Sequence, residues 1–309
     1  MRRVLIDTDR GVDDSMMLQI ALGSPSIQVV GLTTVFGNGS VDQTTRNALI
    51  NCEVADRMDI PVAKGAGGPL LPWRRHKTGT AVHGKDVLGN SNWPDPSGAP
   101  IETAAALFLV EQIEKWPGEL TVLAVGSLTN LAIAVALEPS IAHKVKGLVV
   151  MGGAIGHAFG DSAIEFNLRS DPESARIVFQ AGWPLTIVPL DVTTTVEMTR
   201  DQFERIRQRR SRSCEFLSAI SPFYFEWCRS RYQRDVMPVH DATALAYILE
   251  PSLFKVERLY VDVAVGDDLT AGLTVADFRQ ESSLAPNANV CRSADSDGCL
   301  GLLMQKLLS

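Results

Sequence analysis

The chain has 309 residues, of which 45% are hydrophobic and 21% are charged, a composition typical of a globular protein with a large core. Its formal net charge is −7 and its pI is near 5.3, so the protein offers no general basic surface to phosphates and no nucleic acid partner is expected. The five cysteines are odd in number and show no C-x-x-C spacing, which disfavours a disulfide framework and a structural zinc site.

Two kinds of apolar segment are missing from the sequence. No run of about 18 apolar residues is present for a membrane span, so no membrane partner is expected. Aspartates interrupt the apolar character of residues 1–30, where a signal peptide would lie. Together with reduced, buried cysteines, these features predict a cytoplasmic protein.

Short apolar runs alternate with helical patterns along most of the chain. Buried strands are predicted at 4–6, 27–34, 120–125, 146–151 and 185–189. Amphipathic or apolar helices are predicted at 12–23, 44–56, 101–116, 128–139 and 171–182. Because strand and helix alternate, the fold class is α/β, with a mainly parallel open sheet and helices on both faces.

Two segments interrupt this alternation. Residues 65–100 are rich in Gly, Pro, Trp and polar residues and are expected to form a long functional loop, or a loop plus a short hairpin. Residues 200–235 are expected to form a polar, partly helical insertion. Its basic run at 205–212 is interpreted as a solvated helix face, with contact to substrate or a neighbouring subunit as the alternative. Neither segment resembles a linker, so a single domain over 1–309 is expected.

An acidic cluster follows the first predicted strand, where residues 7–14 read DTDRGVDD. In an open parallel sheet, ligands bind beyond the carboxyl ends of the strands, which is where this cluster falls. Asp7 and Asp9 point the same way if the strand persists, and Gly11 permits a tight turn. Aspartates 13 and 14 then open a helix, whose N-terminus favours anions.

The four aspartates can therefore converge on one point. Helix capping and solvation are the alternative explanation for any one of them, but the whole set favours a hard divalent cation. Asp7 is expected to support the others from behind.

Three further segments place polar side chains just after a predicted strand or before a helix. They are 33–38 (TTVFGN), 163–175 (AIEFNLRSDPESA) and 238–251 (PVHDATALAYILEP). Asn38 follows a strand, and Glu165 and Asn167 lie on one side of the chain if it is extended. His240 and Asp241 precede a helix, where an aspartate N-cap is the simpler alternative.

These segments together resemble the nucleoside hydrolase family, the inosine–uridine preferring nucleoside ribohydrolases. That family carries D-x-D-P-G-x-D-D near its N-terminus, where this chain has DTDRGVDD. Further matches in family order are HGKDVLG (83–89), AVGSLTNLA (124–132), MGGA (151–154), EFNLRSDPE (165–173) and HDATALAY (240–247). The resemblance covers nearly the whole chain. It implies a Rossmann-like nucleoside hydrolase fold and hydrolysis of the N-glycosidic bond of ribonucleosides to ribose and a free base.

The resemblance also implies a tightly held Ca²⁺ ion. The carboxylates of Asp9, Asp14 and Asp241 would bind this ion, and Val125 would add its backbone carbonyl. Calcium suits an oxygen-only ligand set that also accommodates water and two sugar hydroxyls, whereas Mg²⁺ demands a small octahedral shell.

Substrate-binding and catalytic roles follow from the same resemblance. The ribose hydroxyls would be bound by four polar side chains: Asp13, Asn38, Glu165 and Asn167. Asp9 would act as general base, His240 would protonate the departing base, and His83 would lie on a loop over the nucleobase. A histidine near its ordinary pKa suits that acid role, and a carboxylate-rich site stabilises the positive charge that develops on the sugar.

The chain departs from the family pattern at two positions. Arg10 replaces the proline of the aspartate motif, and Val87 replaces a glycine of the histidine loop. Arg10 is expected either to tune the metal site or to face solvent, and Val87 is expected to restrict the closing motion of the loop that carries His83. The candidates for base contacts are Tyr224 and Tyr232 with Arg229, Arg231 and Arg234, whereas Met151 and Trp227 are interpreted as packing residues.

Two other functions remain open. A nucleoside-binding homologue with weakened catalysis would explain the two departures. A magnesium-dependent phosphatase is suggested by the DTDRG stretch, although the threonine of that phosphatase motif is absent. The resemblance further implies purine or pyrimidine salvage, and a homotetramer or dimer.

Overall fold

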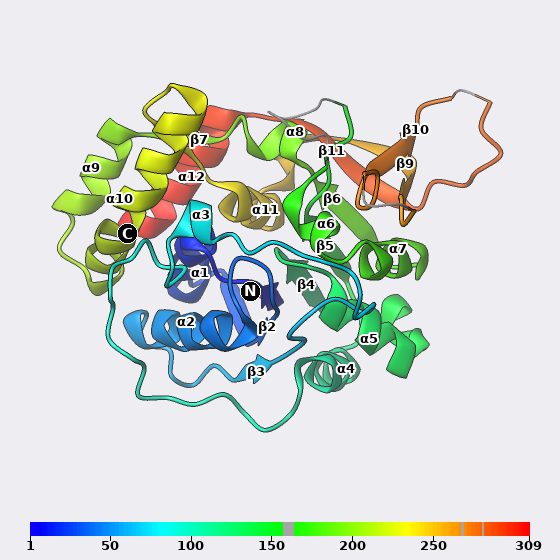
Figure 1. The fold of residues 1–309 in the computed structure, drawn as a ribbon, viewed down its shortest axis with the longest axis horizontal. Helices are drawn as coiled ribbons and strands as arrows, with labels where there is room; N and C mark the ends of the chain where they lie inside the picture. Colours follow the sequence, from blue (N-terminus) through cyan, green and yellow to red (C-terminus); the bar gives the residue numbers. More distant parts are fainter. Residues whose placement is uncertain (157–163, 267–268, 280) are drawn as a thin grey trace.

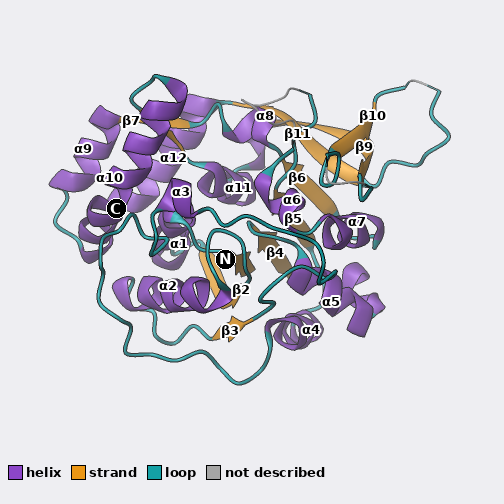
Figure 2. Ribbon diagram, viewed as in Figure 1, coloured by secondary structure: helices purple, strands orange, loops and turns teal. Residues whose placement is uncertain are grey.

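The computed structural model describes residues 1–156, 164–266, 269–279 and 281–309. Its main feature is a nine-stranded sheet with helices on both faces (Figures 1 and 2). The strands of this sheet are β1 (Arg2–Thr8), β2 (Ile27–Thr34), β3 (Val62–Lys64), β4 (Leu120–Ala124), β5 (Gly147–Met151), β6 (Leu185–Val188), β9 (Phe254–Val263), β10 (Thr274–Asp277) and β11 (Ala288–Ala294). A separate two-stranded sheet contains β7 (Glu197–Thr199) and β8 (Val236–Pro238).

The strand order is β10-β9-β11-β6-β5-β4-β1-β2-β3. The seven strands from β11 to β3 run parallel, and β9 and β10 are antiparallel to their neighbours. The prediction of a mainly parallel α/β sheet is confirmed. After β1 the chain continues to β2 and β3 on one side, and then returns to β4, β5 and β6 on the other. The switch point of the sheet therefore lies between β1 and β4, where a crevice opens at the carboxyl ends of the strands.

Helices cover both faces because the buried strands are apolar on both sides. One face carries α1 (Val12–Gly23), α2 (Val41–Val54), α10 (Arg212–Tyr232), α11 (His240–Leu249) and α12 (Ser296–Leu308). The other carries α4 (Ala105–Lys115), α5 (Thr129–Leu137) and α7 (Pro172–Gln180). In β1, Val4 and Ile6 pack into the first core and Leu5 packs into the second, as the alternation of a strand requires.

The remaining helical segments are short or peripheral. They are α3 (Thr80–His83), α6 (Phe166–Ser170), α8 (Leu190–Thr193), α9 (Arg200–Gln208) and the 3₁₀ helices η1 (Pro139–His143) and η2 (Pro251–Leu253). Residues 65–100 contain α3 and no strand, so the loop is observed without the alternative hairpin. Residues 200–235 form α9 and α10, and α10 buries an apolar face that includes Phe216, Ile220 and Phe225. No helix among the described residues is long and apolar enough to span a membrane, and all five cysteines are buried and free.

Gly31 in β2 allows α4 to pack closely on the sheet. A Cβ atom at Gly31 would lie 2.4 Å from Cε1 of Phe108, and Phe108 is itself buried in the core formed by α4. We predict that Gly31→Ala lowers the free energy of unfolding by about 1–3 kcal/mol, because the ring must leave a well-packed position. Denaturant unfolding measures this change.

Two further variants control this prediction. A Cβ atom at Gly23 would have no neighbouring atom within 4 Å, so Gly23→Ala should change stability by less than about 0.5 kcal/mol. Adding Phe108→Leu to the Gly31→Ala variant should recover part of the loss. If Gly31→Ala is as stable as the parent, the close approach is not a packing constraint.

Candidate active site

A cavity of about 320 Å³ lies at the switch point. Its lining includes most of the residues predicted for the site: Asp9, Asp13, Asn38, His83, Val125, Glu165, Asn167, Tyr224, Tyr232, His240 and Asp241. Asp14 is fully buried beside them. Side chains that are distant in the sequence are thus brought to one place by the parallel sheet and by the first turns of α1 and α11.

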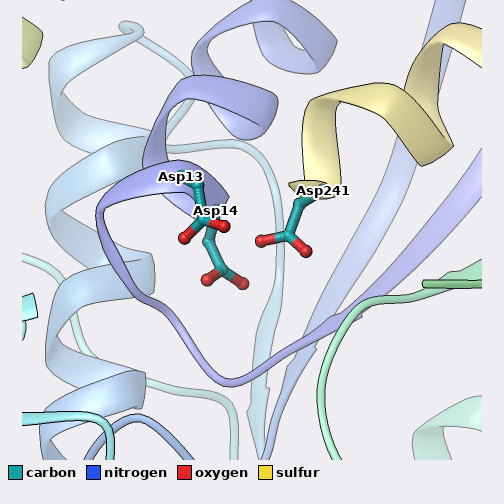
Figure 3. A group of neighbouring side chains, drawn as sticks. All are labelled: Asp13, Asp14 and Asp241. Carbon is teal, nitrogen blue, oxygen red and sulfur yellow. The ribbon is translucent and has the colours of Figure 1, made fainter. Parts of the chain in front are cut away.

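Three carboxylates form a compact cluster in this cavity. Asp13 and Asp14 come from the first turn of α1, and Asp241 faces them from the first turn of α11 (Figure 3). Each offers one oxygen, and these oxygens all lie within 4.8 Å of one another. Both helix N-termini favour negative charge, and an oxygen-only ligand set suits a hard divalent cation.

Burial and repulsion raise the pKa values of three carboxyl groups here: Asp9, Asp13 and Asp241. Burial, and then the charge of Asp14, raise the pKa of Asp13 to about 8. The same two causes, burial first, raise the pKa values of Asp9 and Asp241 well above their ordinary range. A divalent cation among these oxygens would offset both causes, so the residues present fit a metal site.

Hydrogen bonds fix two of the carboxylates. The Thr8 hydroxyl donates to one oxygen of Asp14, and the Gly11 N–H donates to the other at 2.6 Å. Asp9 accepts from the Asn38 backbone N–H at 2.8 Å and from its Nδ2 at 3.2 Å. The three clustered carboxylates in the structure are Asp13, Asp14 and Asp241. The family resemblance instead implied Asp9, Asp14 and Asp241 as the metal ligands.

A second polar group lies at the start of α6. The Glu165 carboxylate accepts three backbone N–H groups, from Asn167 at 2.7 Å, Leu168 at 3.0 Å and Gly153 at 3.2 Å. Burial raises the pKa of Glu165, and these N–H groups oppose that rise. Asn167 Nδ2 donates to the Val125 carbonyl at 3.1 Å, so the carbonyl predicted to bind the metal accepts a side-chain amide here.

Both histidines of the cavity are held neutral near pH 7. His83 Nδ1 accepts the backbone N–H of Val12 at 3.1 Å, and burial lowers the His83 pKa to about 4. His240 Nδ1 lies 2.8 Å from the Thr193 hydroxyl, and burial, followed by the charge of His83, lowers the His240 pKa to about 4. The expectation that His240 titrates near its ordinary pKa is therefore wrong, because the side chain is desolvated.

Aromatic side chains also line the cavity. The Tyr224 ring lies 5.2 Å from the His83 ring and stacks on Trp227 at 6.3 Å, and Trp227 meets Tyr232 edge-on at 5.9 Å. Trp227 lines the cavity, as does Met151, so their interpretation as packing residues alone was incomplete. No sequence signal separated Trp227 from a core tryptophan.

The three arginines suggested for base contacts (Arg229, Arg231 and Arg234) are not among the lining residues.

Arg10 is fully buried and does not face solvent. Its φ is 44°, in the left-handed region. Nη1 donates to the Asp14 carbonyl at 3.3 Å, and within the described residues Nε and Nη2 have no partner. Burial lowers the Arg10 pKa to about 10, and the charge of Asp14 opposes this, so the side chain remains a cation beside the carboxylate cluster.

Val87 occupies a position that suits glycine. Its φ is 61° and its side chain is fully buried. A β-branched residue in the left-handed region is strained. The segment that carries His83 therefore holds a conformation imposed by packing.

The fold and the cavity together define a class of protein: an α/β protein with a parallel sheet and, at its switch point, carboxylates that could hold a metal ion. The description "Inosine-uridine preferring nucleoside hydrolase" belongs to the family model that matches residues 4–300. The chain belongs to this family, whose members are metal-dependent hydrolases acting on N-glycosyl bonds of nucleosides.

Individual relatives support this assignment over the full chain. A probable uridine nucleosidase 2 of Arabidopsis thaliana is 39% identical over 99% of this chain and 98% of its own length. The inosine-uridine preferring nucleoside hydrolase of Crithidia fasciculata is 32% identical over 99% and 97%. Among solved structures, the plant nucleoside hydrolase PpNRh1 superposes with a TM-score of 0.93 at 33% identity, covering 100% of this chain and 99% of that one.

Asn130 connects the carboxyl ends of the central strands beneath the cavity. Its Nδ2 donates to Asp7 at 2.7 Å and to the Thr34 carbonyl at 3.0 Å, and its Oδ1 accepts the Ala66 N–H at 2.9 Å. Asp7 is fully buried, and burial raises its pKa to about 6.

We predict that Asn130→Ala lowers the free energy of unfolding by about 1–3 kcal/mol, because it leaves buried polar groups unsatisfied. Thermal and urea unfolding measure the change. Gln305→Ala, at an exposed position of α12, is the control and should be neutral within about 0.5 kcal/mol. Equal stability of the two variants would contradict a structural role for Asn130.

Proposed function

We propose that the protein is a calcium-dependent ribonucleoside hydrolase that accepts both uridine and inosine. The observation that carries this proposal is the group of carboxylate oxygens within 4.8 Å of one another, next to the polar side chains at the start of α6. Such an arrangement suits a sugar whose vicinal hydroxyls reach a cation. The printed names of the relatives refer to uridine and to inosine–uridine preference, which supports a substrate range that includes a pyrimidine and a purine.

The proposed metal ligands are Asp9, Asp14, Asp241 and the carbonyl of Val125. Asp13, which the structure places with the cluster, is proposed to bind ribose together with Asn38, Glu165 and Asn167. When bound, the cation would orient the sugar and lower the pKa of a water molecule. The flexible coordination of Ca²⁺ fits this mixed set better than that of Mg²⁺.

The proposed reaction transfers one water across the C1′–N bond. Asp9 would remove a proton from the attacking water, whose oxygen bonds to C1′ as the bond to the base breaks. The carboxylates would stabilise the positive charge that develops on the sugar. If the Thr193 hydroxyl donates to Nδ1 of His240, the ring proton lies on Nε2, where it would hydrogen-bond the leaving base, and His240 would pass to that base the proton that the attacking water releases.

The cellular compartment, the metabolic role and the oligomeric state are proposed from the cysteines and from the family resemblance. Five free, buried cysteines support a reducing compartment, and we propose a cytoplasmic enzyme of purine or pyrimidine salvage. A homotetramer or a dimer is proposed from the family resemblance.

The first test is catalytic. We expect uridine and inosine to yield ribose and free base without phosphate, and we expect chelation to abolish turnover until Ca²⁺ is restored. Asp9→Asn should lower kcat at least about 100-fold, because it removes the general base. Asp42→Asn, at an exposed aspartate that pairs with Lys64, is the control and should retain full activity.

Three results would contradict this assignment. Full activity of Asp9→Asn would remove the proposed base. The absence of turnover on every nucleoside would favour a binding protein. Release of inorganic phosphate from nucleotides would favour the phosphatase alternative.

The second test concerns Arg10. A buried guanidinium opposes a divalent cation in the adjacent cluster, so Arg10→Met should tighten Ca²⁺ binding by about tenfold. Titration against a chromophoric chelator measures the affinity. Arg10→Lys keeps the charge and should leave the affinity within about threefold of the parent. Unchanged or weaker binding by Arg10→Met would contradict a charge effect.

A further inference from the structure

A second cavity, of about 440 Å³, adjoins the catalytic one. It is lined by Arg74, Arg75, His76 and Lys77 of the loop after β3, by Ile164, Phe166, Arg169 and Ser170 at α6, and by Ala271. Lys77 and Phe166 line both cavities. The two spaces therefore meet at these two side chains.

The second cavity is strongly basic in a protein of net charge −7. Arg75, Lys77 and Arg169 make no side-chain ion pair or hydrogen bond with any other described residue, and no described carboxylate lines the cavity. Arg74 is engaged with Glu173 across the rim. Unpaired cations gathered around one hollow favour an anionic ligand, and arginine suits the oxygens of a phosphate.

His76 contributes a packing contact to this loop and no positive charge near pH 7. Its ring packs edge-on against Phe36 with the ring centroids 4.6 Å apart, and burial lowers its pKa. This contact connects the basic loop to the segment after β2, next to Asn38. The loop is thereby held beside the catalytic cavity.

The second cavity meets the catalytic cavity beside the residues proposed to bind ribose. Phe166, which is shared by the two spaces, is flanked in sequence by the proposed ribose ligands Glu165 and Asn167. The aromatic side chains of Tyr224 and Trp227 line only the catalytic cavity. A ligand group in the basic cavity would therefore extend from the sugar and not from the base.

Ribonucleoside chemistry identifies which sugar position can reach this cavity. The 2′ and 3′ hydroxyls are vicinal and suit chelation of one cation, whereas the 5′ oxygen lies on a separate exocyclic carbon. We propose that the basic cavity binds the 5′-phosphate of a nucleoside 5′-monophosphate whose ribose occupies the carboxylate site.

This inference rests on the proposed function and extends its substrate class. In the reaction, the oxygen of water bonds to C1′, the C1′–N bond breaks, and a proton passes to the base. The phosphate ester stays intact, so the products are ribose 5-phosphate and the free base.

The test compares uridine, uridine 5′-monophosphate and uridine 3′-monophosphate with the calcium-loaded enzyme. We expect the 5′-monophosphate to yield uracil and ribose 5-phosphate, and the 3′ isomer to be a poor substrate. Arg75→Gln and Arg169→Gln should each raise the KM for the 5′-monophosphate roughly five- to tenfold. Neither residue lines the catalytic cavity, so kinetics with uridine should not change. Arg210→Gln, which removes an exposed charge at a residue that lines neither cavity, is the matched control and should have no effect.

Binding to the Asp9→Asn variant separates this inference from the reaction. Calorimetry should show that Arg75→Gln and Arg169→Gln, added to Asp9→Asn, weaken binding of the 5′-monophosphate but not of uridine. If no nucleoside is hydrolysed while this binding pattern holds, the proposed reaction fails and the anion site stands. If uridine is hydrolysed but the 5′-monophosphate neither reacts nor binds, the anion site is overturned. Inhibition by inorganic phosphate that depends on Arg75, without binding of the 5′-monophosphate, would assign the cavity to free phosphate and would also overturn the inference.

Discussion

Repulsion among buried carboxylates is the constraint on which the site depends. Asp9, Asp13 and Asp241 line one pocket at the carboxyl edge of the sheet, with Asp14 buried beside them, and burial raises the pKa values of the three lining aspartates. Several neighbouring groups act against this cost. Backbone N–H groups and hydroxyls donate to the carboxylates, two helix N-termini point at them, and one arginine is buried behind them. The remaining imbalance is what suits the site to a bound metal cation.

Much of the fold was predictable because its central strands are continuous apolar runs. The strand expected at 27–34 is β2, and the helix expected at 12–23 is α1. The strands β9, β10 and β11 were not predicted. In β9, polar residues alternate with apolar ones and several side chains are exposed, which is the pattern of an antiparallel strand with one solvated face and is a weaker signal than a continuous apolar run. Its pairing with β11 also depends on contacts between distant residues.

The residues of the site were predicted better than its chemistry. Motifs at the ends of strands identified the side chains that line the cavity, since topology alone brings those ends together. The convergence of Asp13 and Asp14 was predicted, but the lowered pKa of His240 and the exposure of Trp227 to the cavity were not. Each depends on side-chain direction and on the extent of desolvation, which are set by packing between elements that are distant in the sequence.

The backbone at Arg10 has a consequence for how this loop can change over evolutionary time. Its φ of 44° is closed to proline, whose ring fixes φ near −65°. A proline at position 10 would therefore require a different backbone path around the same aspartates. Glycine and asparagine tolerate both conformations. A change from arginine to proline at position 10 is therefore a change of backbone path as well as of side chain.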